Sequence, residues 1–247
     1  MGAPFDQGLP FQLPDHRDKQ TGFAQFGGPH ILTLVTEVAT RALKAVRHQK
    51  YNVHRRLRPE ALAGWMYQRR NGDASVRERL RELERMEQAF GGSSGIGSAL
   101  DGVNGAGNWL LPMAFPEGSP AHPAYGAGHA TVAGACVTIL KGWFDHGHAL
   151  THAGNAIAFE PVADGSALND VSASLKRPLT VEGELNKVAA NISLGRGWAG
   201  VHYYTDYVES FRLGEQIALG VLEEQKVTYR EFFSMTVPLH DGSCVQI

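Results

Sequence analysis

The chain has 247 residues, of which 43% are hydrophobic, and its formal net charge is −2. This length is enough for one large domain or two small ones, with an ample core. The small net charge gives no reason to expect nucleic acid or an acidic membrane surface as a partner. No stretch is apolar for long enough to predict a transmembrane helix, so we expect no membrane partner either.

Residues 1–28 predict an extended, non-helical arm. Pro and Gly recur in this segment, and its apolar side chains follow no helical period. These side chains are Phe5, Leu9, Phe11, Leu13, Phe23 and Phe26. Because they have no periodic partner within the arm, we expect them to be exposed together and to make the chain associate. The contact would use the arm and the helix predicted after it.

That helix is predicted over residues 29–49, where apolar residues recur at intervals of three and four. Pro29 suits its first turn. A short helix is expected to begin near Pro59, and a third is predicted over residues 74–90 with Asp73 as its N-cap.

Residues 91–128 predict a glycine-rich active-site loop, which is close to low complexity up to Gly107. Later elements are a possible strand at 156–162 and helices at about 129–144, 181–194 and 201–225. Helical patterns dominate and no βαβ alternation appears. We therefore predict an all-α helical bundle that forms a single domain over residues 1–247.

Three segments contain residues suited to an oxyanion. They read Lys50-(seven residues)-Arg58-Pro59, Gly128-His129-Ala-Thr, and Arg196-(five residues)-His202-Tyr. Lysine and arginine neutralise anionic oxygens, and backbone N–H groups at a helix N-terminus donate to them. A histidine can act as a base or bond the central atom. The pattern therefore indicates a site for a tetrahedral or trigonal-bipyramidal oxyanion.

The order and spacing of these segments resemble the vanadium-dependent haloperoxidases, and within them the bromoperoxidases of red algae and cyanobacteria. Residues 53–61 and 206–215 look like that subgroup in particular. The resemblance implies a helical bundle of the vanadium haloperoxidase and type-2 acid phosphatase kind. It also implies that the chain corresponds to the C-terminal, active-site half of those enzymes. The N-terminal half would then be absent or supplied by a separate chain.

The resemblance further implies vanadate as cofactor. The residues implied to hold it are Lys50, Arg58, Gly128, His129, Arg196 and His202, with His202 bonded to the metal. His129 would deprotonate hydrogen peroxide, and Lys50 would polarise bound peroxide towards attack by halide. The implied function is oxidation of bromide or iodide, rather than chloride, to a hypohalous acid that reacts with a small organic acceptor.

Two further residues are expected to modulate this site. His122 occupies the position of a second histidine in bromoperoxidases, where it would tune His129 or contact the halide, or else pack in a loop. Arg47 lies one helical turn before Lys50, at the position that influences halide preference in related enzymes. An arginine there resembles bromoperoxidases more than chloroperoxidases, which have an aromatic residue.

Three other features of the site remain open in the sequence. Asp206 would orient His202, cap a helix or pair with an arginine. The basic run at Arg55 and Arg56 is expected to be a solvated surface. Ala127 replaces the serine that usually precedes Gly-His in the family, and loss of that hydrogen bond costs roughly 1.5–3 kcal/mol.

Alternatives to the haloperoxidase function are an acid phosphatase and a weakly active assembly module. In a phosphatase His202 would attack phosphorus and His129 would protonate the leaving group. The resemblance also raises a possible calcium site at Asp15 and Asp18, although their spacing is not diagnostic. The expected assembly is a homo-oligomer or a complex with a chain that carries the N-terminal half.

Overall fold

The structure is a computed structural model that describes residues 2–12, 20–92 and 95–247. The calcium ligands predicted at Asp15 and Asp18 lie outside these residues, as does Leu13. The chain divides into two compact units, whereas the sequence predicts a single domain. The first, here called the bundle unit, comprises Met1–Ala45, Gly128–Ser193 and Glu209–Ile247. The second, the site unit, comprises Val46–Ala127 and Leu194–Val208.

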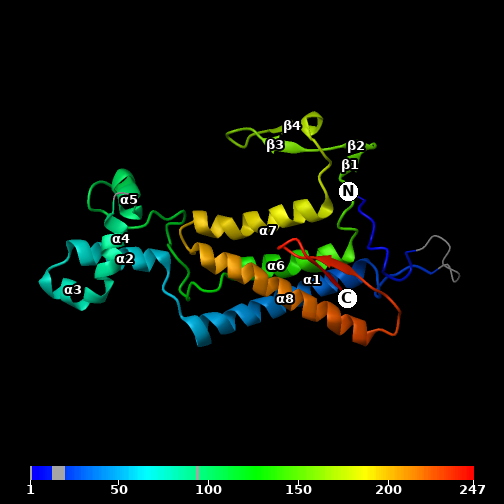
Figure 1. Cartoon of the computed structure of the whole chain (residues 1–247), viewed down its shortest axis with the longest axis horizontal. Helices are drawn as coiled ribbons and strands as arrows, with labels where there is room; N and C mark the ends of the chain where they lie inside the picture. Colours follow the sequence, from blue (N-terminus) through cyan, green and yellow to red (C-terminus); the bar gives the residue numbers. More distant parts are fainter. Residues whose placement is uncertain (1, 13–19, 93–94) are drawn as a thin grey trace. The chain divides into compact units, whose positions relative to one another are not determined.

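Helices account for most of the regular structure, which confirms the predicted helical bundle (Figure 1). The long helices are α1 (Gly28–His48), α6 (Gly128–Trp143), α7 (Val181–Trp198) and α8 (Tyr204–Thr228). The shorter ones are η1 (Gln49–His54), α2 (Pro59–Asn71), α3 (Ala74–Arg79), η2 (Arg81–Leu83), α4 (Glu84–Gly91), α5 (Ile96–Asn104) and η3 (Ser172–Ser174). Among the described residues, no helix combines the length and apolarity needed to cross a membrane.

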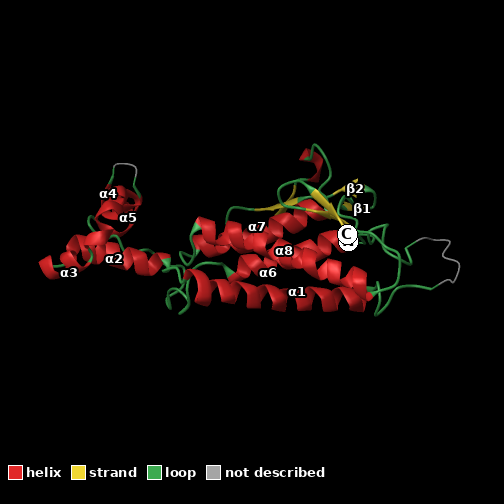
Figure 2. Ribbon diagram, turned by 60° about the horizontal axis from the view of Figure 1, so that its bottom comes forward, coloured by secondary structure: helices red, strands yellow, loops and turns green. Residues whose placement is uncertain are grey.

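The strands form short antiparallel pairs, drawn in yellow in Figure 2. The pairs are β1 (Thr151–His152) with β2 (Asn155–Ala156), β3 (Phe159–Pro161) with β4 (Leu168–Asp170), and β5 (Thr236–Pro238) with β6 (Cys244–Gln246). The strand predicted at 156–162 corresponds to β3 and the end of β2, so it belongs to two hairpins rather than one strand.

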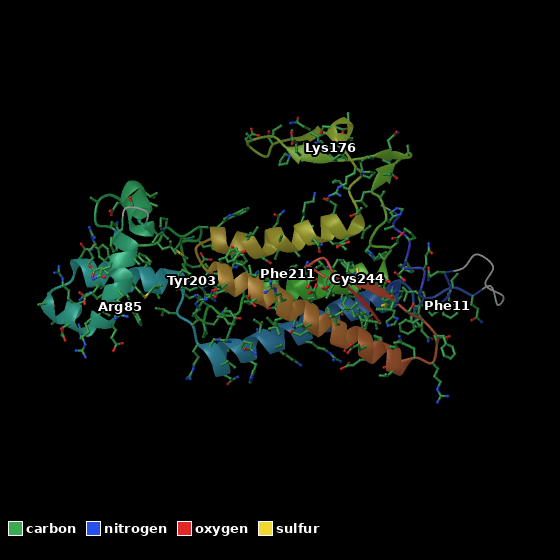
Figure 3. All side chains as sticks on the ribbon, viewed as in Figure 1. Phe11, Arg85, Lys176, Tyr203, Phe211 and Cys244 are labelled. Carbon is green, nitrogen blue, oxygen red and sulfur yellow. The ribbon has the colours of Figure 1, made fainter. Side chains whose placement is uncertain are left out.

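The bundle unit has its main core between α1, α6 and α8. The predicted apolar stripe of α1 supplies the buried residues Ile31, Leu34, Val38 and Ala42. Opposite them lie Ala135, Ile139 and Trp143 of α6 and Ala218, Val221 and Leu222 of α8. A second cluster joins α6 to α7, and Phe211 of α8 packs against it (Figure 3). Each large apolar side chain buried in this way contributes roughly 1.5–3 kcal/mol.

The N-terminal arm is not the exposed apolar surface that the sequence predicts. Leu9 and Phe26 are buried in the main core of the bundle unit, and Phe5 and Phe11 pack against it. Of the described apolar residues of the arm, Phe23 is the exposed one, at 72%. The ring of Phe26 stacks on Trp143, 6.3 Å away. Because the apolar side chains of the arm pack against residues far along the chain, their burial follows no periodic pattern in the sequence. The prediction that they are exposed was therefore wrong.

The site unit has its own small core, in which Met66, Leu100 and Trp109 are buried. Leu100 lies on α5, a helix within the segment predicted as a flexible loop. One glycine there has a packing role: a Cβ on Gly97 would lie 2.8 Å from the ring of Trp109. Close contact with an aromatic ring, rather than flexibility, therefore explains a glycine at this position.

The helix predicted over 74–90 is divided in the structure into three consecutive helices, α3, η2 and α4. Its predicted cap is confirmed, since Asp73 accepts hydrogen bonds from the backbone of Ser75 (2.9 Å) and Val76 (3.0 Å). Within this segment Arg81 pairs with Glu78, whereas Glu87 pairs with Arg69 of α2.

Candidate oxyanion site

Lys50 anchors one side of the site within the site unit. It lies in η1, the π-helical turn that follows α1, and is only 3% exposed. Its Nζ donates to the carbonyl oxygens of Pro123 (2.7 Å) and Ala124 (3.2 Å). An ammonium group carries three N–H donors, so one remains for another acceptor.

Arg58 connects three parts of the site. It is the N-cap residue of α2, and Pro59 takes the first helical position as predicted. Nε donates to His122 O at 2.7 Å, and one terminal nitrogen donates to Val201 O at 2.7 Å. The same nitrogen lies 3.2 Å from Nε2 of His202, and the other lies 2.8 Å from Nδ1 of His122.

His202 is held between a donor and an acceptor. Its Nδ1 lies 3.1 Å from Oδ2 of Asp206, while its Nε2 faces Arg58. A guanidinium can only donate and an ionised carboxylate can only accept, so the ring proton belongs on Nδ1. The lone pair of Nε2 then points to the cationic side of the site. Burial lowers the pKa of His202 to about 4, although its hydrogen bond to Asp206 opposes this shift.

Asp206 both orients His202 and pairs with an arginine. It is fully buried in the first turn of α8. Burial opposes its ionisation, but hydrogen bonds from His202 and the backbone of Tyr203 outweigh that effect and lower its pKa. Its ion-pair partner is Arg56, whose terminal nitrogen lies 2.8 Å from Oδ1.

The side chain of Arg56 is 40% exposed, as expected for a basic run at the surface, but it also reaches the site through this ion pair, which the sequence does not predict. Its guanidinium also lies over the ring of Tyr203, 4.1 Å from the ring centre. Tyr203 is labelled in Figure 3. The partner of Arg56, the carboxylate of Asp206, is known to be buried only from the structure. A run of basic residues does not show which of its members contacts such a carboxylate.

Arg196 supplies a cation near the end of α7. Its Nε is buried and has no hydrogen-bond partner among the described residues. Its guanidinium lies 6.0 Å from the ring centre of Phe115. Leaving a buried donor unsatisfied costs roughly 1–3 kcal/mol, and more for a charged group. An acceptor brought in by a ligand would remove that cost.

Positive charges outnumber negative charges in the site, as expected for a site that binds an anion. Burial and then the nearby charge of Arg58 lower the pKa of Lys50 to about 8, although the charge of Asp206 opposes this shift. The pKa of Arg58 is lowered by burial and then by Arg196. These cations oppose one another's ionisation, and a bound anion would offset both the burial and the repulsion.

The remaining predicted residues fall into two groups. His122 joins the site through Arg58, and burial followed by the charge of Lys50 lowers its pKa. Arg47 is exposed, and its charge acts on His122 in the same direction. Gly128 and His129 open α6 in the bundle unit, directly after Ala127 in the chain. Their roles in the site stay predictions.

The lowered pKa of Lys50 predicts a pH-dependent stability. In the unfolded chain Lys50 keeps its proton up to about pH 10.5, whereas the folded chain releases it near pH 8. The unfolded state therefore binds more protons between these values, so stability rises with pH across this window. The contribution of Lys50 is of the order of 3 kcal/mol.

Urea unfolding of the anion-free chain and of Lys50→Met, at pH 7.5 and pH 10.5, measures this contribution. We expect the original chain to gain more free energy of unfolding than the variant as the pH rises. Equal gains would contradict the placement of a charged, buried Lys50.

The arrangement points to a class of protein: a helical bundle with a buried, cationic, histidine-containing candidate site for an oxyanion. Residues 34–230 match the family model described as the VCPO second helical-bundle domain. The chain belongs to this family, and the predicted relation to vanadium-dependent haloperoxidases is confirmed.

The described residues contain no group of three or more His, Cys, Asp or Glu side chains placed to hold a metal ion.

Individual relatives agree with this assignment. The whole chain is 49% identical, over 254 aligned residues, to a vanadium-dependent bromoperoxidase of Corallina pilulifera. It is 35% identical over 238 residues, or 93% of the chain, to a vanadium-dependent bromoperoxidase of Ascophyllum nodosum. These alignments cover 41% and 40% of the two relatives, so the chain spans about two fifths of their length.

A solved structure has the same fold. It is the homohexameric structure of the second vanadate-dependent bromoperoxidase of Ascophyllum nodosum, with a TM-score of 0.70 and 28% identity. The match covers 93% of this chain and 41% of that one.

Proposed function

We propose that the chain forms the vanadate-binding part of a vanadium-dependent bromoperoxidase, which oxidises bromide with hydrogen peroxide to hypobromous acid. The observation that carries this proposal is the group of buried cations around His202, in which Arg196 retains a buried donor without a partner. The 49% identity to a bromoperoxidase over the whole chain supports the same activity. Iodide would also be a substrate, and chloride a poorer one.

The donors of the site fit a vanadate oxyanion. Lys50 uses two of its three N–H donors, and the contacts of Arg58 account for four of its five. Together with Nε of Arg196, they leave charged donors for several anionic oxygens. The carboxylate of Asp206, whose charge acts on Lys50 and Arg58, is already paired with Arg56 and His202.

His202 would bond the metal through Nε2, the nitrogen whose lone pair is available. Arg58 donates to that lone pair in the structure. Bound vanadate would replace the contact between Arg58 and His202, and both Nε2 of His202 and the N–H of Arg58 would then be available to the anion. Bound vanadate supplies a Lewis acid that activates hydrogen peroxide towards attack by halide.

Four residues outside the direct cation set have proposed roles. His129 would accept the proton of incoming hydrogen peroxide as a general base, and the Gly128 backbone N–H would donate to vanadate. His122, already bonded to Arg58, would tune His129 or contact the halide. Arg47 would favour bromide over chloride, because its exposed positive charge lies close enough to shift the pKa of His122.

Bromination and hydrolysis assays test the proposal directly. The chain is incubated with orthovanadate, bromide and hydrogen peroxide, and separately with a generic phosphomonoester. We expect bromination that depends on vanadate and little hydrolysis, because the named relatives are bromoperoxidases rather than phosphatases. Hydrolysis without vanadate-dependent bromination would favour a phosphatase with His202 as nucleophile, and neither activity would favour an assembly module.

Restoring the missing hydroxyl should strengthen vanadate binding. Ala127 is fully buried, so a serine hydroxyl there would lack water and gain an acceptor only from a bound anion. We expect Ala127→Ser to lower the vanadate concentration for half-maximal bromination, by up to tenfold for about 1.4 kcal/mol recovered. The vanadate-free variant should be slightly less stable than the original. An unchanged or higher vanadate requirement would mean that the pocket is shaped around alanine.

We also infer that the chain associates, with copies of itself or with a chain that carries the N-terminal half. The support is the homohexameric assembly of the solved relative. The arm cannot be the main contact, because Leu9 and Phe26 are already buried within the chain. Light scattering at micromolar concentration should show a species larger than a monomer. A monodisperse monomer that still brominates at full rate would contradict this inference.

A further inference from the structure

We propose that Arg56 is a positioning residue: it holds Asp206 so that His202 keeps its proton on Nδ1 and presents the lone pair of Nε2. The inference rests on the proposed function only for the identity of the group that Nε2 binds. The state of the imidazole itself can be measured without that group.

The carboxylate of Asp206 needs a fixed partner because it is wholly buried. Its Oδ2 accepts from Nδ1 of His202 at 3.1 Å and from the backbone N–H of Tyr203 at 3.0 Å. Its Oδ1 accepts from Arg56 at 2.8 Å. The side chain of Arg56 is 40% exposed, whereas that of Asp206 is wholly buried, so loss of Arg56 would leave Oδ1 of a buried carboxylate without its charged partner. Arg56 therefore holds the carboxylate of Asp206 in place.

Arg56 contacts several residues of the segment that follows His202. The nitrogen that bonds Asp206 also donates to the hydroxyl of Thr205 at 2.7 Å. The guanidinium plane lies over the ring of Tyr203 at 4.1 Å. Three of the four residues that follow His202 are thus attached to one side chain. A lysine could keep the charge and donate to both oxygens, but it lacks the planar guanidinium that covers the ring of Tyr203.

Arg56 and Arg58 act on opposite sides of the same imidazole. Arg58 donates to Nε2 at 3.2 Å, which a doubly protonated ring could not accept. Arg56 acts on Nδ1 through the carboxylate between them. Either tautomer, or a flipped ring, becomes accessible if Asp206 is released. Loss of a residue that orients a metal-bound histidine typically weakens metal affinity by about ten- to a hundredfold.

The test combines two readouts on Arg56→Gln, with Arg55→Gln as the matched control. Arg55 is the adjacent arginine, and its exposed side chain lies outside the site. The first readout is the histidine ring ¹⁵N NMR spectrum of the vanadate-free chain, in which the His202 signals are assigned by their loss in His202→Ala. The second is the vanadate concentration for half-maximal bromination.

We expect the original chain and Arg55→Gln to show His202 as a single neutral tautomer with the proton on Nδ1. Arg56→Gln should show averaged ring nitrogens and a vanadate requirement raised about ten- to a hundredfold. Arg56→Lys, which preserves the charge and the fold, should fall between them. A single Nδ1–H tautomer in both Arg56 variants would overturn the proposal, whether or not the vanadate requirement changes. If the original chain binds no vanadate, the proposed function fails while the tautomer measurement still decides the role of Arg56.

Discussion

Replacement of His202 by alanine is expected to abolish bromination at every vanadate concentration. Nε2 of His202 is the lone pair that the site presents to a metal, and the other residues around it supply charged donors. More vanadate can offset a weakened cation, because affinity then rises with concentration, but it cannot replace a missing bond to the metal. The measurement is the bromination rate across a wide range of orthovanadate concentrations.

The variant should remain folded, which makes the loss interpretable. Without the imidazole, Asp206 keeps its bonds from Arg56 and the backbone of Tyr203, and Arg58 keeps its bond to Val201 O. Circular dichroism and urea unfolding provide the check. Near-original bromination by folded His202→Ala would show that His202 is not the metal ligand.

Replacement of Arg58 by methionine should have the second largest effect, of a different kind. The variant loses a cation and the contact to Nε2 of His202, but it keeps the proposed metal ligand. A charge-assisted hydrogen bond is worth roughly 1.5–3 kcal/mol. The vanadate concentration for half-maximal bromination should therefore rise roughly ten- to a hundredfold. At saturating vanadate, much of the bromination should return.

Arg55→Gln controls for the lost positive charge, since its side chain is exposed on the same short segment. It should leave the vanadate requirement unchanged. If Arg55→Gln weakened vanadate binding as much as Arg58→Met, the effect would be one of net charge rather than of a contact in the site. If Arg58→Met could not be rescued at any concentration, Arg58 would have a role beyond holding the anion.

The helices could be predicted from the sequence where buried apolar residues recur at the helical interval of three and four. The stripe of α1, with Leu34, Val38 and Ala42 in the core, follows directly from spacings of three and four. The caps at Asp73 and Pro59 are also local signals, and both are confirmed. The exposure of the arm and the absence of α5 were predicted wrongly, because Phe26 and Leu100 are buried against residues distant in the chain, Trp143 and Met66.

The site shows the same division. Lys50, Arg58 and His202 could be predicted because their order and spacing resemble a known family, and the structure brings them together. Arg56 could not, because the direction of its side chain depends on the end of η1. There Arg55 adopts a left-handed conformation, with φ of 46°, before the chain enters α2. Nothing in a run of basic residues indicates such a turn.

The central claim is that this chain holds vanadate at His202. The most direct test is vanadium content after equilibrium dialysis of the intact chain against orthovanadate, with His202→Ala dialysed beside it. The account predicts that the original chain retains one vanadium per chain and that the variant retains almost none. Equal retention by both, or no retention by the original chain, would contradict it.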